Sequence, residues 1–272
     1  MSKTILITGA GSGLGKGTAL GLAAKGHNVI AGVHKWEQKS RLLEDAKKAG
    51  VIDNLEIIKL NILDFMDCQK AWEYDIDILV SNAGIGHSGP VSEMPVGLIR
   101  QVMETNVFSA LEFAQPFINS MVEKKKGKLV FVSSVAGLST TPYLGAYNAS
   151  KHALEAIVQS LRHELVPMGI SVATINPGPF DTGFNDRMYD TYAQWFNEEE
   201  YFTPRKNIEA AAKAMAEGQF DPQPMIDKMI EIIPQDKHDF RTILPTDFVK
   251  MCKDYEDNQY EIQCDSVDES KK

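Results

Sequence analysis

Short apolar runs alternate with helical stretches along most of this 272-residue chain. The first apolar run is Ile5–Ile7, and runs of the same kind recur at 28–33, 55–60, 76–80, 128–132 and 170–175. Helical patterns fill the intervals, at 14–25, 37–49, 66–72, 98–122 with an interruption at Pro116, and 146–166. Strands that alternate with helices indicate a parallel sheet covered on both faces. The pattern therefore predicts an α/β fold with one doubly wound parallel sheet, in a single domain over residues 1–272.

Composition and charge exclude several classes of protein. A formal net charge of −9 argues against binding to nucleic acid or anionic membranes, although it also simply favours solubility. Cys68, Cys252 and Cys264 are scattered, which is typical of a reducing compartment, and no metal-site spacing occurs. The chain enters its first strand without a signal peptide, and no apolar run approaches the roughly 20 residues of a membrane span. We expect a cytoplasmic protein with no metal, nucleic-acid or membrane partner.

A glycine-rich turn, Thr8–Gly15, separates the first predicted strand from the first helix. Its glycines Gly9, Gly13 and Gly15 have the spacing Gly-x-x-x-Gly-x-Gly, which differs from the Gly-x-Gly-x-x-Gly fingerprint. Glycine lets the backbone turn sharply beside a pyrophosphate, and the helix that begins near Leu14 offers free N–H groups and its positive end. The turn predicts a dinucleotide-phosphate site, with a purely structural turn as the alternative.

Three side chains further along the chain supply a hydroxyl, a phenol and an ammonium. Tyr147 and Lys151 are four residues apart on a predicted helix and share a face, where the lysine charge would lower the pKa of the phenol. Ser134 follows the fifth strand at its carboxyl end, where open α/β sheets bind ligands, and its hydroxyl can stabilise a developing oxyanion. Tyr-x-x-x-Lys alone is a common surface pair. Together with the glycine turn, the three residues predict hydride transfer with Tyr147 as general acid or base.

With these elements in order, the chain resembles the short-chain dehydrogenase/reductase family over roughly residues 3–245. The resemblance rests on Thr8-Gly9-x-x-x-Gly13-x-Gly15, Asn82-Ala83-Gly84, Asn106, Ser134, Tyr147-x-x-x-Lys151, and Pro177-Gly178 with Thr182. It implies a Rossmann-type fold and an NAD(P)-dependent oxidoreductase that interconverts a carbonyl compound and a secondary alcohol. It also implies assembly into a homodimer or homotetramer.

The resemblance implies a role for each of four catalytic residues. Tyr147 would be the acid/base, Lys151 would hold the nicotinamide ribose, Ser134 would orient the substrate oxygen, and Asn106 would hold a water that links Lys151 to solvent. The predicted cofactor-binding residues are Gly9, Ser12, Gly13, Leu14, Gly15, His34, Asn61, Ile62, Asn82, Ala83, Gly84, Tyr147, Lys151, Pro177, Gly178, Phe180 and Thr182.

The chain departs from the family pattern in three places. Asn61-Ile62 stands where an aspartate usually contacts the adenine, and Ser81 replaces the first asparagine of the common Asn-Asn-Ala-Gly. The usual glycine-rich end of the last strand is missing. Instead, Phe240–Pro245 leads into an acidic C-terminal extension over about 246–272, which leaves dimer and tetramer equally open.

The end of the second strand bears on the choice between NAD and NADP. An acid there would bind the 2′-hydroxyl of NAD, but the chain has Val33-His34-Lys35 and no acid before Glu37. His34 and Lys35 could attract a 2′-phosphate instead. Against this, Ser12 stands where many NADP-dependent members carry a base, and His34 could be a solvated loop residue. The balance favours NADP(H) over NAD(H).

A segment over about 181–205 interrupts the strand–helix alternation and is rich in aromatic residues and methionine. We expect a loop that covers the substrate, which would then have an apolar or aromatic body. The alternative is that these residues only pack the rim of the domain.

Two other functions are less consistent with the sequence. A non-catalytic dinucleotide-sensing regulator generally lacks the Tyr/Lys pair, and a nucleotide-sugar epimerase or dehydratase usually has a different glycine spacing.

Overall fold

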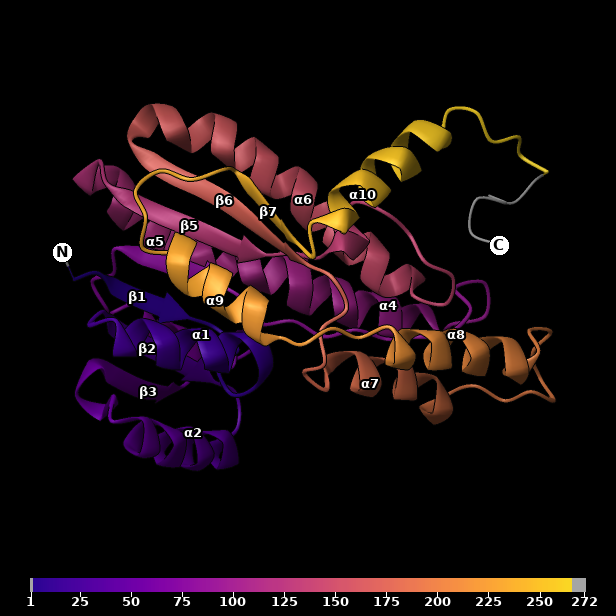
Figure 1. Ribbon diagram of the computed structural model, residues 1–272, viewed down its shortest axis with the longest axis horizontal. Helices are drawn as coiled ribbons and strands as arrows, with labels where there is room; N and C mark the ends of the chain where they lie inside the picture. The colour runs from indigo at the N-terminus through magenta and orange to yellow at the C-terminus, as the bar shows by residue number, and fades with distance from the viewer. Residues whose placement is uncertain (1, 266–272) are drawn as a thin grey trace.

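The computed structural model describes residues 2–265 and contains one seven-stranded parallel sheet (Figure 1). The strands lie in the order β3-β2-β1-β4-β5-β6-β7. Their bounds are β1 Thr4–Ile7, β2 Asn28–Val33, β3 Leu55–Lys59, β4 Ile78–Ser81, β5 Gly127–Val132, β6 Ile170–Pro177 and β7 Arg241–Leu244. The strand order reverses between β1 and β4, where a doubly wound sheet forms its ligand-binding crevice. The predicted doubly wound fold is confirmed.

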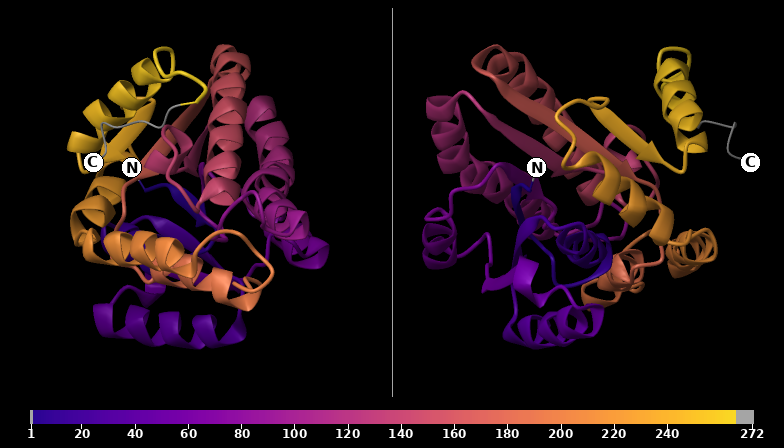
Figure 2. Two further views of the ribbon diagram at one scale, coloured as in Figure 1. Left: turned by 90° about the vertical axis from the view of Figure 1, so that its right-hand side faces the viewer. Right: turned by 60° about the vertical axis from the view of Figure 1, so that its left-hand side comes forward.

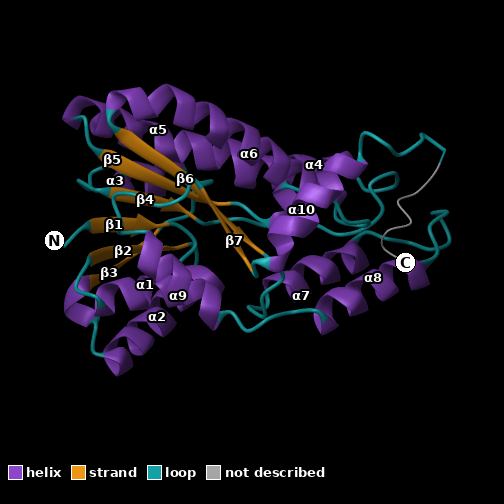
Figure 3. Cartoon of the chain, turned by 45° about the horizontal axis from the view of Figure 1, so that its top comes forward, coloured by secondary structure: helices purple, strands orange, loops and turns teal. Residues whose placement is uncertain are grey.

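Helices cover both faces of the sheet (Figure 3). One face carries α1 (Gly13–Ala24), α2 (Trp36–Ala49) and α9 (Gln223–Ile232), and the other carries α3 (Phe65–Ala71), α5 (Ser109–Lys124) and α6 (Gly145–Leu165). Side chains that alternate along β1 contribute to the cores on both faces of the sheet. Ile5 and Ile7 join the buried cluster of the first face, and Leu6 joins that of the second. Such burial on both faces explains why the strands read as continuous apolar runs.

Three further helices lie beyond the carboxyl ends of the strands, as Figures 1 and 2 show. They are α7 (Phe184–Tyr189), α8 (Arg205–Glu217) and α10 (Asp247–Asn258). The segment predicted as a loop at 181–205 therefore contains α7 and a 3-10 turn, Asp190–Gln194. Part of the acidic C-terminal extension forms α10, and its residues 266–272 lie outside the described part. None of the helices over 2–265 is both long enough and apolar enough to cross a membrane.

The interruption predicted at Pro116 is wrong in its position. Helix α5 runs through Pro116 without a break. Phe113 and Phe117 lie on either side of the proline, both buried, with ring centroids 5.4 Å apart, and their packing outweighs the one helical hydrogen bond that proline removes. The helix is instead interrupted earlier, by a π-helical turn over Glu104–Phe108 that follows α4 (Val96–Met103).

Lys128 of β5 ties the sheet to the end of α9. Its buried ammonium donates hydrogen bonds to the carbonyl oxygens of Ile232, Ile233 and Gln235 at 3.0, 2.9 and 2.8 Å. A cation at a helix C-terminus satisfies carbonyls that have no partner within the helix and is favoured by the helix dipole. Burial lowers the pKa of Lys128 to about 8, and the charge of Asp236 acts in the opposite direction.

Lys128→Met should therefore destabilise the fold. The variant keeps most of the buried stem but removes the donor to three carbonyls, so we expect the free energy of unfolding to fall by about 2–4 kcal/mol. Urea unfolding followed by circular dichroism measures this difference. An unchanged midpoint of unfolding would show that the carbonyls find other donors at no cost.

Candidate active site

The glycine turn lies at the carboxyl end of β1, pressed against the segment that follows β4. Gly9 and Gly13 have φ angles of +67° and +54°, a region that other residues rarely adopt. A Cβ added at Gly9 would lie 2.8 Å from the Cα of Ala83, and one at Gly15 would lie 2.5 Å from Asn82 Nδ2. The turn is thus a shallow cradle that side chains would fill, with the N-terminus of α1 directly behind it.

Thr8 and Asn82 hold this turn in place. The Asn82 side chain donates to the carbonyl oxygens of Thr8 and Gly9 at 2.9 and 3.2 Å. The Thr8 hydroxyl accepts from the backbone N–H groups of Asn82 and Ala83 at 2.9 and 3.0 Å. The Asn82 amide thus fastens the turn to the segment that follows β4.

The segment after β6 meets the same turn from the other side. A Cβ added at Gly13 would lie 3.1 Å from the Cβ of Thr182, so Thr182 sits next to the start of α1. Gly178 donates to the carbonyl of Leu244 in β7 at 2.8 Å, and the buried ring of Phe180 packs against Phe220. Pro177 ends β6 within this arrangement.

Ser134, Tyr147 and Lys151 come together as the sequence predicts. Ser134 follows β5, and its hydroxyl accepts from the N–H of Ala136 at 3.1 Å. Tyr147 and Lys151 lie one turn apart on α6, only 8% and 4% exposed, and the Lys151 ammonium is 5.6 Å from the centroid of the Tyr147 ring. The ammonium also donates to the carbonyl of Val132 at 2.9 Å.

Asn106 lies in the π-helical turn and joins this group through Gly84. A Cβ added at Gly84 would lie 3.1 Å from Asn106 Oδ1 and 3.8 Å from the Lys151 ammonium. Asn106 accepts from the N–H of Ile85 at 2.8 Å and donates to its carbonyl at 2.8 Å and to the Ser150 hydroxyl at 2.9 Å. Asn106 therefore clamps the chain after β4 onto α6. A π turn is frequent at functional sites, but nothing in the sequence marks this one.

Burial shifts both titratable groups of the site. It raises the pKa of Tyr147 to about 12, and a hydrogen bond with the Ser134 side chain acts in the opposite direction. It lowers the pKa of Lys151 to about 8, against the charge of Glu155, which raises it. The sequence predicts that Lys151 lowers the pKa of the Tyr147 phenol, but the pKa is raised instead. Desolvation of Tyr147 outweighs the hydrogen bond that favours the phenolate. Tyr147 is a proton donor at neutral pH.

The predicted adenosine end lies at the carboxyl ends of β2 and β3. Loss of solvation, followed by the charges of Lys35 and Lys59, lowers the pKa of His34, so this exposed imidazole is mostly neutral at pH 7. Gln38, in the first turn of α2, accepts from the backbone N–H of Lys35 at 3.2 Å. A Cβ added at Gly11 would lie 2.5 Å from the Gln38 amide carbon, so Gln38 covers this part of the glycine turn.

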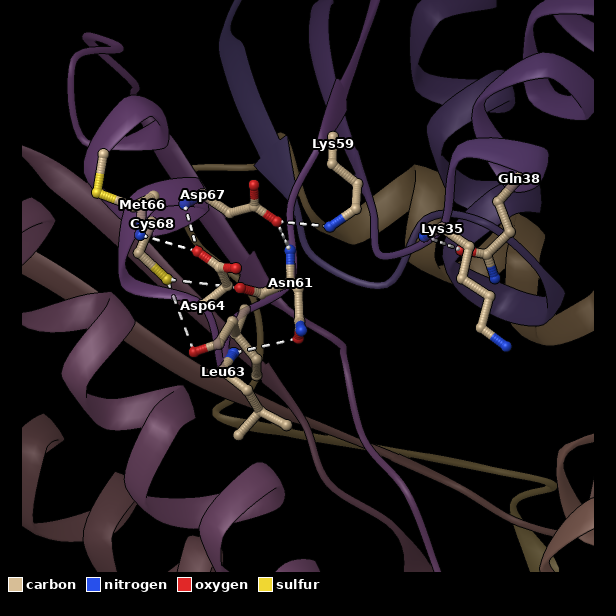
Figure 4. Close-up of polar contacts among 10 residues, drawn as sticks. Lys35, Gln38, Lys59, Asn61, Leu63, Asp64, Met66, Asp67 and Cys68 are labelled. Atoms are coloured by element: carbon tan, nitrogen blue, oxygen red, sulfur yellow. Dashed lines mark hydrogen bonds and ion pairs between the residues drawn. The ribbon is translucent and has the colours of Figure 1, made fainter.

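Asn61 and Ile62 lie in the connection between β3 and α3, which Figure 4 shows. Asp67 accepts from the backbone N–H of Asn61 at 2.9 Å and pairs with Lys59 at 2.6 Å. The Asn61 side chain accepts from Leu63 at 3.2 Å, and Ile62 is buried. Lys59, Asp67 and Gln38 were not anticipated, and their separation in sequence gives no signal for these contacts.

A cavity of about 520 Å³ lies along the same edge of the sheet. Its lining residues are Trp36, Lys39, Ile58, Lys59, Asp67, Lys70, Glu73 and Tyr74. None of them was predicted as a site residue, and the cavity belongs to the outer side of β3 rather than to the crevice that contains Tyr147.

The segment over 181–205 covers Tyr147. Phe184 has its ring centroid 5.7 Å from that of Tyr147. A Cβ added at Gly86 would lie 3.2 Å from the Tyr147 ring and 2.2 Å from the Met188 sulfur, so Gly86 and Met188 also enclose the phenol. Ser88 fastens the two chain segments by donating to the carbonyl of Tyr189 at 2.7 Å. Phe184 and Met188 of this segment therefore pack close to the Tyr147 ring.

Comparisons with known proteins agree with this geometry. Residues 3–193 match the family model for short chain dehydrogenases. The chain is 32% identical over 237 residues to an uncharacterized oxidoreductase of Bacillus subtilis, covering 85% of this chain and 84% of the relative. It is 34% identical over 189 residues to an NADPH-dependent 3-dehydrocapnine reductase of Ornithobacterium rhinotracheale, covering 65% of each.

Solved structures share the fold over nearly the whole chain. A short-chain dehydrogenase from Streptomyces avermitilis aligns with a TM-score of 0.78 at 25% identity, covering 96% of this chain and 94% of the other. A short chain dehydrogenase/reductase from Burkholderia phymatum in complex with NAD aligns with a TM-score of 0.81 at 23% identity, covering 98% and 97%.

This chain belongs to the short-chain dehydrogenase family and is a nicotinamide-dependent oxidoreductase. The expectations for family, Rossmann-type fold and hydride-transfer chemistry are therefore confirmed. Neither the regulator nor the nucleotide-sugar epimerase receives support from the relatives.

Proposed function

We propose that this protein reduces a ketone or aldehyde to an alcohol, or runs the reverse reaction, with Tyr147 as the proton-transferring group. The observation that carries the proposal is the convergence of Tyr147, Ser134 and Lys151 at the carboxyl end of β5, with the glycine cradle after β1 at the same edge of the sheet. A nicotinamide cofactor, when bound, supplies or accepts the hydride. The cradle fits such a group, because its glycines leave backbone N–H groups and the N-terminus of α1 available to phosphates, with Gln38 and Thr182 at its borders.

Each side chain has a definite task in the reducing direction. Tyr147, with its raised pKa, gives a proton to the oxygen of the carbonyl as negative charge develops there. The Ser134 hydroxyl orients this oxygen, and the Lys151 ammonium stabilises the phenolate that remains. Asn106 keeps the Ile85 segment in place and would position the water that returns a proton to Lys151. The predicted cofactor residues would extend from these groups past the glycine turn to the carboxyl ends of β2 and β3.

Tyr147→Phe tests the proposal, because it removes the proton and leaves the ring. After a screen of carbonyl compounds and alcohols with both cofactors, we expect turnover in this variant to fall by roughly 10²–10⁴-fold. Absorbance of the reduced nicotinamide measures turnover, and its fluorescence on binding measures cofactor affinity, which should stay unchanged. Tyr74→Phe, at the end of α3, is the matched control. Near-normal turnover without the Tyr147 hydroxyl would refute the mechanism.

Lys151 makes ketone reduction dependent on pH. The pKa of Tyr147 is about 12 and that of Lys151 about 8, so across neutral pH the phenol keeps its proton while the ammonium loses its charge as pH rises through about 8. Turnover in the reducing direction should therefore decline above about pH 8. Profiles of kcat from pH 6 to 10 measure this, and Lys151→Arg, which stays charged, should lack the decline. A flat profile up to pH 10 in the unmodified enzyme would contradict the role of Lys151.

We propose NADP(H) as the preferred cofactor. No carboxylate is offered by Val33, and the exposed Lys35 at the start of α2 would lie near the 2′ position of a bound cofactor. The lowered pKa of His34 leaves Lys35 as the main positive group there. One relative is named as NADPH-dependent, which is consistent, and a fold neighbour binds NAD.

Lys35→Ala should reduce the preference for NADPH. A charged hydrogen bond to phosphate is worth about 1.5–3 kcal/mol, so we expect kcat/KM with NADPH to fall about ten- to a hundredfold and that with NADH to stay nearly constant. Lys25→Ala is the control, because it removes an equal charge at the C-terminus of α1, the end away from the glycine turn. If the unmodified enzyme prefers NADH, Lys35 points into solvent and the proposal is wrong.

We further propose that residues 1–272 act as one catalytic domain whose segment 181–205 covers a substrate with an apolar or aromatic body. Support comes from Phe184 and Met188, which place an aromatic ring and a thioether against Tyr147. Bulky apolar ketones should accordingly be turned over with higher kcat/KM than small polar ones such as dihydroxyacetone. The opposite ranking would show that the segment is structural rim.

The three free cysteines support a reducing, cytoplasmic location.

Self-association into a homodimer or homotetramer is the expected assembly. Closed symmetric assemblies are the usual outcome for soluble oligomers. The surfaces proposed for pairing are the long helices α5 and α6, each of which would lie next to the same helix of the partner subunit. Light scattering at micromolar concentration should give two or four times the chain mass of 30.2 kDa. A monomer mass would refute this expectation.

A further inference from the structure

A buried carboxylate lies one helical turn beyond Lys151 and has no task in the reaction described so far. Glu155 of α6 has a side chain only 4% exposed. It accepts from Arg241 of β7 at 2.6 Å and from the side chain of Asn176 in β6 at 2.6 Å. Burying a charge is costly unless it is paired and hydrogen-bonded, and an apolar residue would fill the same space at less cost. The carboxylate therefore calls for a specific explanation.

Asn176 connects this carboxylate to Ser134. Its side-chain nitrogen, fully buried, donates both to Glu155 and to the backbone carbonyl of Ser134, the latter at 3.1 Å. Helix α6 also contacts this segment two residues before Ser134, because the Lys151 ammonium donates to the carbonyl of Val132. Helix α6 is thus fastened at two points to the segment that carries Ser134.

Helix α6 packs closely against the turn that follows Ser134. A Cβ added at Gly137 would lie 2.9 Å from the Lys151 carbonyl, 2.9 Å from the Ser133 hydroxyl and 3.1 Å from Glu155 Cγ, so no side chain fits there. This close packing brings the helix that carries Tyr147 against the turn that carries Ser134. Placing reacting groups within a fraction of an ångström matters, because a 1 Å displacement can cost about a hundredfold in rate.

We propose that Glu155 and Asn176, anchored by Arg241, are positioning residues that hold the Ser134 hydroxyl in register with the Tyr147 phenol. The inference rests on the proposed function, since it assigns these residues to the same site. It also gives β7 a role in that site, because Arg241 anchors the network from the edge of the sheet.

The two residues act in separable ways. Asn176 carries the geometric link to Ser134, whereas the charge of Glu155 also acts on Lys151 and raises its pKa. The titratable and charged groups around Lys151 in the described residues are Tyr147 and Glu155 on α6 and, behind the carboxylate, Arg241 on β7. Removal of the carboxylate charge should make the Lys151 ammonium lose its proton at lower pH, while loss of the Asn176 amide should not.

Asn176→Ala and Glu155→Gln test this separation. Asn176→Ala leaves the Glu155–Arg241 pair intact, and Glu155→Gln retains an acceptor for Asn176 but removes the charge. We expect Asn176→Ala to lower kcat about tenfold, with KM for the cofactor unchanged, in reduction of 9,10-phenanthrenequinone, an apolar aromatic dicarbonyl. Lys128→Met is the control for mere destabilisation, since it removes a buried hydrogen-bonding group at the far end of β5 and should keep kcat.

The titration of Lys151 supplies a second measurement that needs no substrate. NMR of protein with ¹³C-labelled lysine, assigned with Lys151→Met, follows its Cε resonance with pH. The midpoint should move to lower pH in Glu155→Gln and stay unchanged in Asn176→Ala. An unmoved midpoint in Glu155→Gln, or a kcat for Asn176→Ala equal to that of Lys128→Met, would overturn the inference. Tyr147→Phe, assayed alongside, shows separately whether the proposed function itself fails.

Discussion

Parallel pairing of β1, β4, β5 and β6 is the constraint on which the rest of the structure depends. In a parallel sheet all strands end at one edge, so the segments that follow these four strands are brought together however far apart they lie in sequence. The glycine turn follows β1, Asn82 follows β4, Ser134 follows β5, and Gly178 follows β6. The register of the strands determines which of these segments begin side by side, because Ile7 pairs with Val80 and Val132 pairs with Ile175.

The ends of parallel strands are nevertheless irregular backbone with polar groups to satisfy, and side chains from neighbouring segments satisfy them. Asn82 bonds the carbonyls of the glycine turn, Asn106 bonds both backbone groups of Ile85, and Asn176 bonds the carbonyl of Ser134. An amide suits this task because it carries a donor and an acceptor in one plane. Three asparagines thereby convert adjacent loops into a rigid frame, which preorganises the site before any substrate arrives.

Much of this could be read from the sequence, for identifiable reasons. Strand β2 was predicted to the residue, because apolar runs bounded by turn residues mark buried strands well. Tyr147, Lys151 and Ser134 were found because helix spacing and position after a strand are local signals. The π turn at Glu104–Phe108 and the helix continuing through Pro116 were not, since nothing local marks the π turn, and the burial of Phe113 and Phe117 around the proline is a matter of tertiary packing. Glu155, Arg241 and Asn176 meet only in three dimensions, and Glu155 reads in sequence as an ordinary helix-surface acid.

Burial of the reacting groups explains why the site combines opposite charges so closely. Enclosure by Phe184, Met188 and Gly86 excludes water, which raises the pKa of the Tyr147 phenol and lowers that of the Lys151 ammonium. Both shifts favour neutral side chains, and a neutral Lys151 could not stabilise a phenolate. The charge of Glu155, which is paired with Arg241, opposes the second shift. Burial and the ion pair therefore act in opposite directions on Lys151: burial favours its neutral form, and the Glu155 carboxylate favours its charged form.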